Sequence, residues 1–273
     1  MLRVRGTSRV LAVLGDPVRH SISPEMQNAA IAALGLNAVY VPLHATPSAL
    51  AATLETCTAL GIAGNLTVPH KKAGATLIPD LTDLARGLGA VNTFWVENGR
   101  LRGDNTDVQG LSAVLAALDA PGPWLLCGTG GSARAVAAVA GATGTPLLVR
   151  SRTAERAAAF CAWARTLDTP PDARPDEGAT AATVINATPC GLDPADPPPV
   201  PPERLSGTGV ALDLVYRAGE TAWVRDCRAR GLRSADGREL LLHQGAAAFE
   251  RFFPGQRAPR EQMRAAIRRA LSG

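Results

Sequence analysis

The stretch that decides the fold is WLLCGTGGSA, residues 124–133, an apolar run that passes through glycines into an alanine-rich segment. It reads G-x-G-x-x-A after a predicted strand, 124–127, and before a predicted helix, which is the setting of a dinucleotide-binding turn. Gly128 allows the tight turn, Gly130 lets a pyrophosphate approach the backbone, and Ala133 lets the helix pack closely against the strand. We therefore expect a dinucleotide site here. The alternative is an ordinary glycine-rich turn of an α/β domain.

The end of the next predicted strand, 146–149, indicates which dinucleotide is bound. A site for NAD has an Asp or Glu about 20 residues after the first glycine, where it holds the ribose 2′-hydroxyl. Here the strand runs into RSRT, residues 150–153, with Arg156 one turn later and Glu155 only after the strand tip. Arginines and hydroxyls suit a 2′-phosphate, because they form charge-assisted hydrogen bonds. The sequence favours NADP over the alternative of a solvated, basic helix start.

Outward from this turn, short apolar runs alternate with helical stretches in both directions. Such alternation is typical of α/β proteins with largely parallel sheets. Ser23 is expected to cap the first helix, because Pro24 suits the first helical position. Ten of the 21 prolines lie between residues 170 and 202, which predicts loops at 168–178 and 189–206. Strands are expected at 10–14, 39–43, 65–68, 92–96, 124–127, 146–149, 183–186 and 210–214, and helices at 24–34, 48–60, 81–88, 108–118, 132–141, 154–167, 221–230, 240–252 and 259–271.

A run of turn residues, DAPGP at 119–123, divides the chain into two halves. The length of 273 residues allows one large domain or two modest ones. With 46% hydrophobic residues the chain can bury a core in each half. We therefore expect two α/β domains with their boundary near this run.

Composition and charge exclude several classes of protein. The formal net charge is +4 and no run of basic residues resembles a nucleic-acid arm, so we expect no nucleic-acid partner. Five cysteines without a CxxC pair argue against a disulfide framework and for reduced thiols in the cytoplasm. The four histidines have no spacing typical of a metal site. No run approaches the roughly 18 apolar residues of a membrane span, so we expect no membrane association.

Lysine occurs only at Lys71 and Lys72, although the chain has 28 basic residues. Arginine cannot release a proton at useful pH, whereas lysine can if its surroundings shift its pKa. The position therefore suggests proton chemistry at one of these lysines. The alternative is chance and a solvated pair.

Polar clusters follow the predicted strands of the first half, where open α/β sheets bind ligands. With motifs from the second half they occur in the order GDPVRHSISP, NLTVPHK, GAVNT, GDNTD, GTGGSARA, SRT with Arg156, NATPCGL, DLVY and HQGA. In this order and spacing the chain resembles the shikimate dehydrogenase family over almost its whole length. The resemblance implies reversible, NADPH-dependent reduction of 3-dehydroshikimate to shikimate, a step in aromatic amino-acid biosynthesis.

The resemblance also implies how the chain is organised. Residues 1–107 and 243–273 would form a mainly parallel α/β substrate-binding domain, to which the C-terminal helices return. Residues 121–238 would form a Rossmann domain that binds NADP. The partner would be the small-molecule substrate alone, and the protein would be a monomer or a homodimer.

Roles for single residues follow from the same resemblance. Lys71 and Asp107 match the catalytic pair, in which a positioned ammonium stabilises the developing oxyanion and supplies its proton. Substrate-binding residues of the family correspond to Ser21, Ser23, Thr67, Asn92, Tyr216 and Gln244. Its cofactor-binding residues correspond to Gly128, Gly130, Gly131, Ser132, Ala133, Ser151, Arg152, Thr153, Arg156, Asn186, Ala187, Thr188 and Gly237.

The sequence departs from the family pattern at a few of these motifs. Ser151 stands where an Asn is usual, Gln27 where a His is usual, and Leu192 and Leu240 where Met is usual. Two rival functions are a quinate/shikimate dehydrogenase that oxidises with NAD and a non-catalytic, ligand-sensing homologue. The first predicts an acidic residue at the tip of strand 146–149, and the second predicts loss of the Lys–Asp pair.

Overall fold

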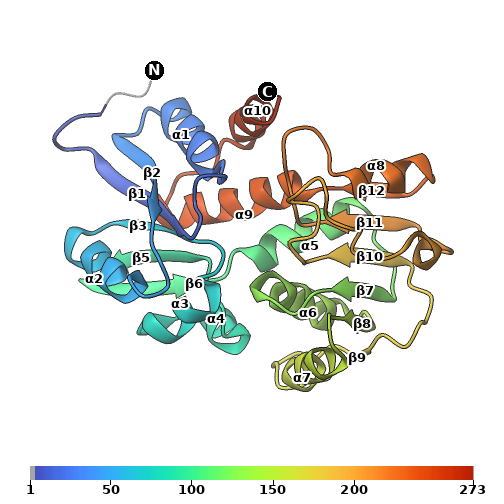
Figure 1. Cartoon of the computed structure of the whole chain (residues 1–273). Coiled ribbons are helices and arrows are strands. Elements are labelled where there is room, and N and C mark those ends of the chain that lie inside the picture. Colours follow the sequence, from blue (N-terminus) through green and yellow to red (C-terminus); the bar gives the residue numbers. More distant parts are fainter. Residues whose placement is uncertain (1–3, 273) are drawn as a thin grey trace. The chain divides into compact units, whose positions relative to one another are not determined.

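The computed structural model describes residues 4–272, which divide into two units. Unit 1 comprises the residues up to Thr106 and those from Leu242 on, and unit 2 comprises Asp107–Leu241. Each unit is built around one six-stranded sheet, and helices alternate with the strands along the chain (Figure 1). The predicted two-domain α/β class is confirmed. None of the helices in the described residues is long and apolar enough to cross a membrane.

Unit 2 has a sheet in the order β12-β11-β10-β7-β8-β9, and every strand pair in it is parallel. The first strand lies in the middle and the order runs outward from it in both directions, which is the doubly wound arrangement of a Rossmann domain. Its elements are α5 (Asp107–Ala117), β7 (Trp124–Cys127), α6 (Gly131–Thr143), β8 (Leu147–Arg150), α7 (Ala154–Ala164), β9 (Ala173–Pro175), β10 (Thr183–Asn186), the 3-10 turn η1 (Pro202–Leu205), β11 (Val210–Asp213), α8 (Ala222–Ala229), β12 (Arg233–Ala235) and the start of α9 (Gly237–Phe252).

The strands of unit 2 are buried on both faces. Side chains alternate between the two faces of a strand, so neighbouring residues enter different core clusters. In β7, Trp124 and Leu126 lie in a core cluster with α5, α6 and α7. Leu125 and Cys127 point the other way, into a second cluster that includes Trp223 of α8. Continuous apolar strands of this kind are expected only when helices cover both faces of a parallel sheet.

Unit 1 has a mixed sheet in the order β2-β1-β3-β5-β6-β4. Strands β2, β1 and β3 are parallel, β5 runs antiparallel to both β3 and β6, and β4 is parallel to β6. Its elements are β1 (Arg9–Gly15), α1 (Ser23–Ala33), β2 (Ala38–His44), α2 (Leu50–Leu60), β3 (Ala63–Leu66), α3 (Lys71–Leu77), β4 (Asp80–Leu81), α4 (Asp83–Leu88), β5 (Thr93–Glu97), β6 (Arg100–Asp104), the rest of α9, and α10 (Arg260–Ala270).

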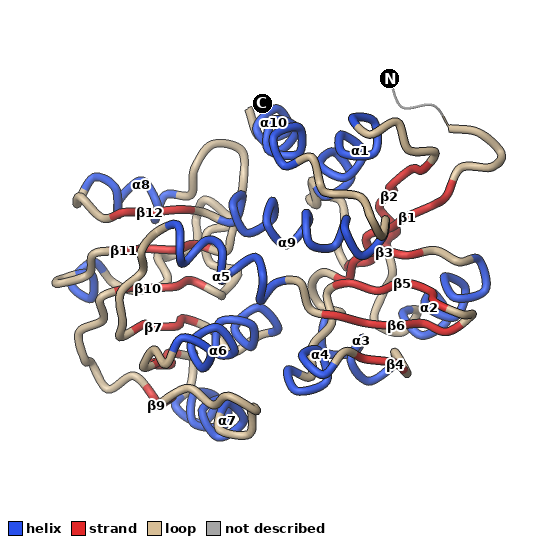
Figure 2. The backbone as a smooth tube through the Cα atoms, turned by 180° about the vertical axis from the view of Figure 1, so that it is seen from behind, coloured by secondary structure: helices blue, strands red, loops and turns tan. Residues whose placement is uncertain are grey.

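Helices also cover both faces of the sheet in unit 1. Leu14, Leu66 and Phe94 form a core cluster with residues of α2 and α4. Helix α10 packs along α1, so the end of the chain joins the first elements (Figure 2). The return of the C-terminal helices to the first half of the chain is therefore present in the fold.

The start of the first helix differs from the prediction. The helix includes Ser23 as its first residue, and the capping position is Ile22, whose side chain makes no cap. The prediction that Ser23 caps this helix is wrong. Instead the hydroxyl of Ser21 accepts a hydrogen bond from the Ser23 N–H at 3.4 Å. Pro24 has no N–H, so the second position of the helix carries no donor that needs an acceptor.

Helix α3, which begins at Lys71, was not expected from the sequence. KKAGATL has no helical period of apolar residues, and a glycine in the middle of a helix is unfavourable. The structure shows why Gly74 is there: a Cβ at this position would lie 2.2 Å from Leu66 Cδ1. The helix therefore packs closely on β3, and tertiary packing overrides its poor propensity.

The proline-rich segments contain more regular structure than predicted. The predicted loop 168–178 contains the edge strand β9, which pairs with β8, and the predicted loop 189–206 contains η1. Proline is tolerated in β9 because an edge strand leaves one row of N–H positions without a ladder partner. Strand β12 and the two-residue strand β4 were also missed.

Candidate active site

The carboxyl ends of β1 and β3 in unit 1 carry three of the proposed substrate residues. Ser21 lies in the loop after β1 and is partly exposed, whereas Ser23 is buried at the start of α1. Thr67 follows β3, where its N–H donates to Leu14 O at 2.9 Å and its carbonyl accepts from His70 N at 2.8 Å. A Cβ on Gly15 would lie 2.5 Å from the Thr67 methyl group, so a glycine lets the two loops approach.

Asn92 is the centre of a buried hydrogen-bond network in unit 1. Its side-chain oxygen accepts from Thr106 N at 2.8 Å and from the hydroxyls of Thr93 and Thr106 at 3.0 and 3.2 Å. Its amide nitrogen lies 3.3 Å from Gln244 Oε1. Asn92 and Gln244 are 152 residues apart in the sequence, so the fold brings two of the predicted substrate residues together.

Asn65 extends this network and was not singled out from the sequence. It lies in β3, is 8% exposed, and accepts a hydrogen bond from Tyr40 Oη at 2.7 Å. Its amide donates to Asn92 O and to Thr93 Oγ1, both at 3.0 Å. An amide in the middle of a fully buried strand is the signal that could have marked it, since buried polar groups need partners.

A buried carboxylate fixes the loop before Asp107. Asp104 is 2% exposed, and one of its oxygens accepts from Thr82 Oγ1 at 2.7 Å and from Asn105 N at 2.8 Å. The other oxygen accepts from Arg251 Nε and Nη2 at 3.1 and 2.9 Å. Arg251 lies seven residues after Gln244 in α9, two turns further along the same helix face. The pair therefore ties α9 to the loop of β6.

Packing between α1 and α9 sets the position of Gln244. The neighbouring Gly245 is buried against α1, where a Cβ would lie 2.2 Å from Met26 Cε. The Gln27 amide donates to Gly245 O at 3.0 Å. Gln27, which stands where the family pattern has a His, is thus used in joining the two helices.

The two proposed catalytic residues are both the first residues of helices. Lys71 begins α3, is partly buried, and its carbonyl accepts from Val91 N at 2.8 Å. Asp107 begins α5 and is 3% exposed. Lys72, the other lysine, is exposed. The two lysines therefore differ in solvent exposure, which fits a proposed catalytic role for Lys71 alone.

The turn after β7 has the geometry of a phosphate-binding loop. Gly128 has φ +109°, and a Cβ there would lie 2.7 Å from Ala187 O, so both conformation and space require glycine. Gly130 is the capping residue of α6, is exposed, and a Cβ on it would meet no atom within 4 Å. Gly131 and Ser132 open the helix, and Ala133 is completely buried against the sheet. The turn thus leaves open space at a helix N-terminus, which suits a pyrophosphate.

The tip of β8 presents a basic surface. Arg152 and Arg156 are exposed, Ser151 is partly exposed, and no acidic residue stands between the strand and α7. Thr153 caps α7 by accepting from Arg156 N at 3.4 Å. A hydrogen bond from its own backbone N–H, and one with Thr153, lower the pKa of Glu155. Side chains of this kind fit the 2′-phosphate of NADP rather than a ribose hydroxyl.

The loop after β10 is held by Asn186, whose side chain is fully buried. Its amide oxygen accepts from Thr188 N and Oγ1 at 3.0 and 2.6 Å, and its nitrogen donates to Cys190 O at 3.0 Å. Ala187 and Thr188 are partly exposed and approach Gly128. Asn186 therefore shapes the loop, and only its neighbours offer surface to a ligand.

Tyr216 and Gly237 lie close to the end of β11. Tyr216 is partly buried in the loop that follows this strand. Gly237 begins α9, and a Cβ on it would lie 2.4 Å from Leu214 O. The glycine is required because α9 starts directly against that loop.

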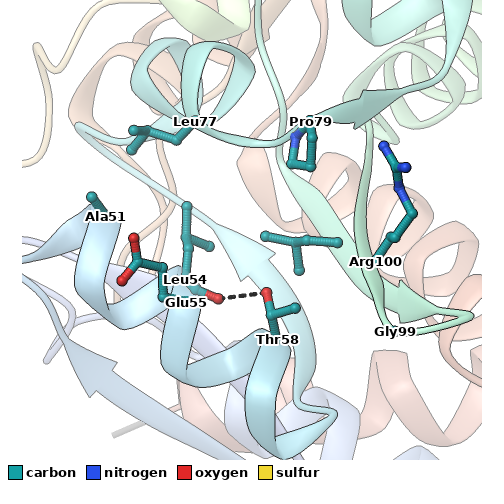
Figure 3. A pocket seen from close by; sticks show the side chains of 9 residues that line it. Ala51, Leu54, Glu55, Thr58, Leu77, Pro79, Gly99 and Arg100 are labelled. Carbon is teal, nitrogen blue, oxygen red and sulfur yellow. Dashed lines mark hydrogen bonds between the residues drawn. The ribbon is translucent and has the colours of Figure 1, made fainter.

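A surface hollow in unit 1 is lined by none of the proposed site residues. It has a volume of about 340 Å³ and is lined by α2, the end of α3 and the β5–β6 turn, with Leu54, Leu77 and Arg100 around it (Figure 3). Because β5 is antiparallel to β3, the turn at Gly99 lies at the opposite end of the sheet from Thr67. Among residues 4–272, no group of three or more His, Cys, Asp or Glu side chains is arranged to hold a metal ion.

Comparisons with known proteins agree with this geometry. Residues 13–94 match the family model described as the shikimate dehydrogenase substrate binding domain, and residues 237–268 match the shikimate 5′-dehydrogenase C-terminal domain. The chain is 38% identical to shikimate dehydrogenase (NADP(+)) of Thermosynechococcus vestitus over 99% of both chains. The chain belongs to the shikimate dehydrogenase family. The resemblance predicted from the ordered motifs is confirmed.

Two further members of the family show how far the likeness extends. The enzyme of Rubrobacter xylanophilus, also named shikimate dehydrogenase (NADP(+)), is 40% identical over 99% of this chain and 98% of its own. The shikimate 5-dehydrogenase of Thermus thermophilus, solved in complex with NADP(H) and shikimate, superimposes with a TM-score of 0.87 at 37% identity. That match covers 96% of this chain and all of the other, so both units share the family fold.

Proposed function

We propose that the protein catalyses the reversible, NADPH-dependent reduction of 3-dehydroshikimate to shikimate, in aromatic amino-acid biosynthesis. The observation that carries this proposal is the 38% identity, over 99% of both chains, to a relative named shikimate dehydrogenase (NADP(+)). The rival of a non-catalytic sensor predicts loss of Lys71 or Asp107, and both are present.

NADPH would be held by unit 2. The open space around Gly130 at the N-terminus of α6 fits the pyrophosphate, and exposed Arg152 and Arg156 fit the 2′-phosphate. When bound, the cofactor supplies a hydride to the carbonyl carbon of the substrate. The further cofactor residues of the proposal are Gly128, Gly131, Ser132, Ala133, Ser151, Thr153, Ala187, Thr188 and Gly237, with Asn186 acting through its loop.

Lys71 would move the proton of the reaction. Negative charge builds on the ketone oxygen as the new C–H bond forms, and an ammonium group stabilises that charge and donates the proton. In the oxidative direction the neutral amine accepts the hydroxyl proton. Asp107 would be the second residue of the catalytic pair. Proton transfer by Lys71 explains a lysine at 71 in a chain that otherwise uses arginine, because a guanidinium does not release its proton.

The substrate ring would be recognised by hydrogen bonds. We propose that Ser21 and Ser23 hold the carboxylate and that Thr67, Asn92 and Gln244 hold the hydroxyls, with Tyr216 near the cofactor. The network around Asn92 supports this, because an amide held by four contacts is already oriented before a ligand arrives. A ligand without the matching hydroxyl would leave these groups unpaired.

Location and assembly are also proposals. The five cysteines of the chain carry free thiols, which is typical of a reducing compartment and supports a cytoplasmic enzyme. We propose a monomer or a homodimer, and sedimentation at several protein concentrations distinguishes the two.

The function is tested by a matrix of two substrates and two cofactors. The purified protein is incubated with shikimate or quinate and with NADP or NAD, and nicotinamide absorbance is followed. We expect turnover of shikimate with NADP to exceed its turnover with NAD by at least about tenfold, because of the charge-assisted contacts of the 2′-phosphate. Faster oxidation of quinate with NAD would favour the rival dehydrogenase. No turnover in any combination would contradict the proposal.

A further inference from the structure

The loops that follow β10 and β11 are joined by one buried carboxylate. Asp213 is the last residue of β11, is completely buried, and lies directly opposite Asn186, the last residue of β10. Its Oδ1 accepts from Asn186 Nδ2 at 2.9 Å and from Val215 N at 3.0 Å. Its Oδ2 accepts from Thr221 Oγ1 at 2.8 Å. Asp213 was not singled out from the sequence.

These three hydrogen bonds lead into two loops. The Asn186 side chain also accepts hydrogen bonds from Thr188 N and Oγ1 and donates one to Cys190 O. It therefore holds the loop of residues 187–191. Val215 and Thr221 bracket the second loop, which contains Tyr216. Both loops leave the carboxyl edge of the parallel sheet, where doubly wound folds bind their cofactor.

The arrangement requires a hydrogen-bond acceptor at position 213, and an apolar side chain of similar size would not replace it. A buried carboxylate is costly unless hydrogen bonds compensate it, and here three donors do so. An apolar residue would leave the Val215 N–H and one of the two Asn186 amide hydrogens without an acceptor, since only the other hydrogen can donate to Cys190 O. The hydrogen bonds that connect the two loops through position 213 would then be lost.

We propose that Asp213 is a positioning residue for the cofactor: its carboxylate sets the relative position of the loop 187–191 and the loop 214–221. This rests on the proposed NADPH-dependent function. Ala187, Thr188 and Tyr216, which the loops carry, contact the ligand, and Asp213 acts only through them. Its loss therefore weakens cofactor binding more than substrate binding.

The first test compares Asp213→Ala with Asp213→Asn. The asparagine Oδ1 can still accept from Asn186 and Val215, so it restores most of the arrangement, whereas alanine cannot. We expect Asp213→Ala to raise the Kd of NADPH, measured by calorimetry without substrate, at least about tenfold. We expect Asp213→Asn to stay within about threefold of the wild type. In Asp213→Ala the KM for shikimate should rise by a smaller factor than the Kd of NADPH, because Tyr216 is the one proposed substrate residue that these two loops carry.

A second pair of variants keeps the test decisive if Asp213→Ala does not fold. Thr221→Val removes the donor to Oδ2 together with the N-cap of α8, where Thr221 Oγ1 accepts from Val224 N at 3.3 Å. Thr183→Val removes another buried hydroxyl at the other end of β10, where Thr183 Oγ1 donates to Pro121 O at 2.8 Å. Both threonines are completely buried. We expect only Thr221→Val to raise the Kd of NADPH, by about threefold, and Thr221→Ser to restore it.

The outcomes separate this inference from the proposed function. If the wild type binds NADPH and oxidises shikimate but Asp213→Ala binds NADPH normally, Asp213 is not a positioning residue. Equal effects of Thr183→Val and Thr221→Val would equally overturn the inference, since they would indicate a general loss of stability. A wild type that binds no NADPH at all would instead contradict the proposed function.

Discussion

The proposed substrate residues of unit 1 and the proposed cofactor residues of unit 2 are built in opposite ways. In unit 1 Asn92 is 2% exposed and is held in a buried hydrogen-bond network, although Ser21, Thr67 and Gln244 are partly exposed. In unit 2 the proposed cofactor would be bound by backbone at the start of α6 and by exposed arginines at the tip of β8. The proposed substrate residues of unit 1 depend on side chains held by hydrogen bonds. The proposed cofactor residues of unit 2 depend on backbone conformation and positive charge.

The difference reflects what each surface has to recognise. The hydroxyl groups of the proposed substrate are neutral and are distinguished only by hydrogen bonds of fixed direction, so the residues that bind them need to be held before it binds. A phosphate carries charge, which backbone N–H groups and flexible arginines attract without being buried. Substitutions in unit 1 should therefore cost stability together with activity, whereas those at the β8 tip should cost affinity alone.

The largest effect is expected at Lys71. Lys71→Ala should lower kcat by about 10²–10⁴-fold, because proton transfer in the transition state contributes this much. The Kd of NADPH should remain unchanged, since Lys71 lies outside unit 2. Steady-state kinetics and calorimetry check both values, with Lys72→Ala as the matched control. Retained turnover in Lys71→Ala would remove this lysine from the chemistry.

A substitution at Asn92 tests whether the stability of unit 1 depends on its buried hydrogen-bond network. Asn92→Ala leaves Thr106 N without its acceptor, so we expect a loss of about 1–3 kcal/mol in the free energy of unfolding. The KM for shikimate should rise in the same variant. Urea denaturation, monitored separately from activity, checks the first value. If Asn92→Ala were as stable as the wild type, the proposed difference between the substrate residues of unit 1 and the cofactor residues of unit 2 would be wrong.

Arg152 tests the opposite expectation for unit 2. Arg152→Ala should raise the KM for NADPH about tenfold, leave the KM for NADH nearly unchanged, and leave the free energy of unfolding unchanged. Arg174→Ala, an exposed arginine in β9, is the control. Equal losses for both cofactors would mean that other residues hold the 2′-phosphate.

The last prediction concerns the pH dependence of stability that Asp213 contributes. Burial raises the pKa of Asp213 from 3.8 to about 6, and repulsion from Asp236 adds to this, although its three hydrogen bonds act against it. Between these two values the folded state holds a proton that the unfolded state has released. Stability should therefore rise as the pH falls from about 6 to 4, by at most about 1 kcal/mol per pH unit. Asp213→Asn should lack this contribution, and a difference from the wild type that does not vary with pH would contradict it.

Most of the fold could be predicted because its signals are local. The strands Trp124–Cys127 and Thr183–Asn186 have the predicted bounds, since each is a short apolar run next to turn residues. The glycine at 128 is required by its own φ of +109°. The elements that were missed, α3 and β9, form against neighbours rather than through their own sequence: Gly74 is needed only because Leu66 lies beside it.

By itself the sequence determined the α/β class, the phosphate turn, the basic tip of β8 and the family, because these depend on residue types at short, fixed spacing. Only the tertiary structure decided that Asn92 meets Gln244, that Arg251 meets Asp104 and that Asp213 meets Asn186. These partners lie 152, 147 and 27 residues apart, and a hydrogen bond across such a distance exists only once the sheets and helices have packed. Local patterns can mark a polar residue as buried, but its partner is set by which elements lie side by side.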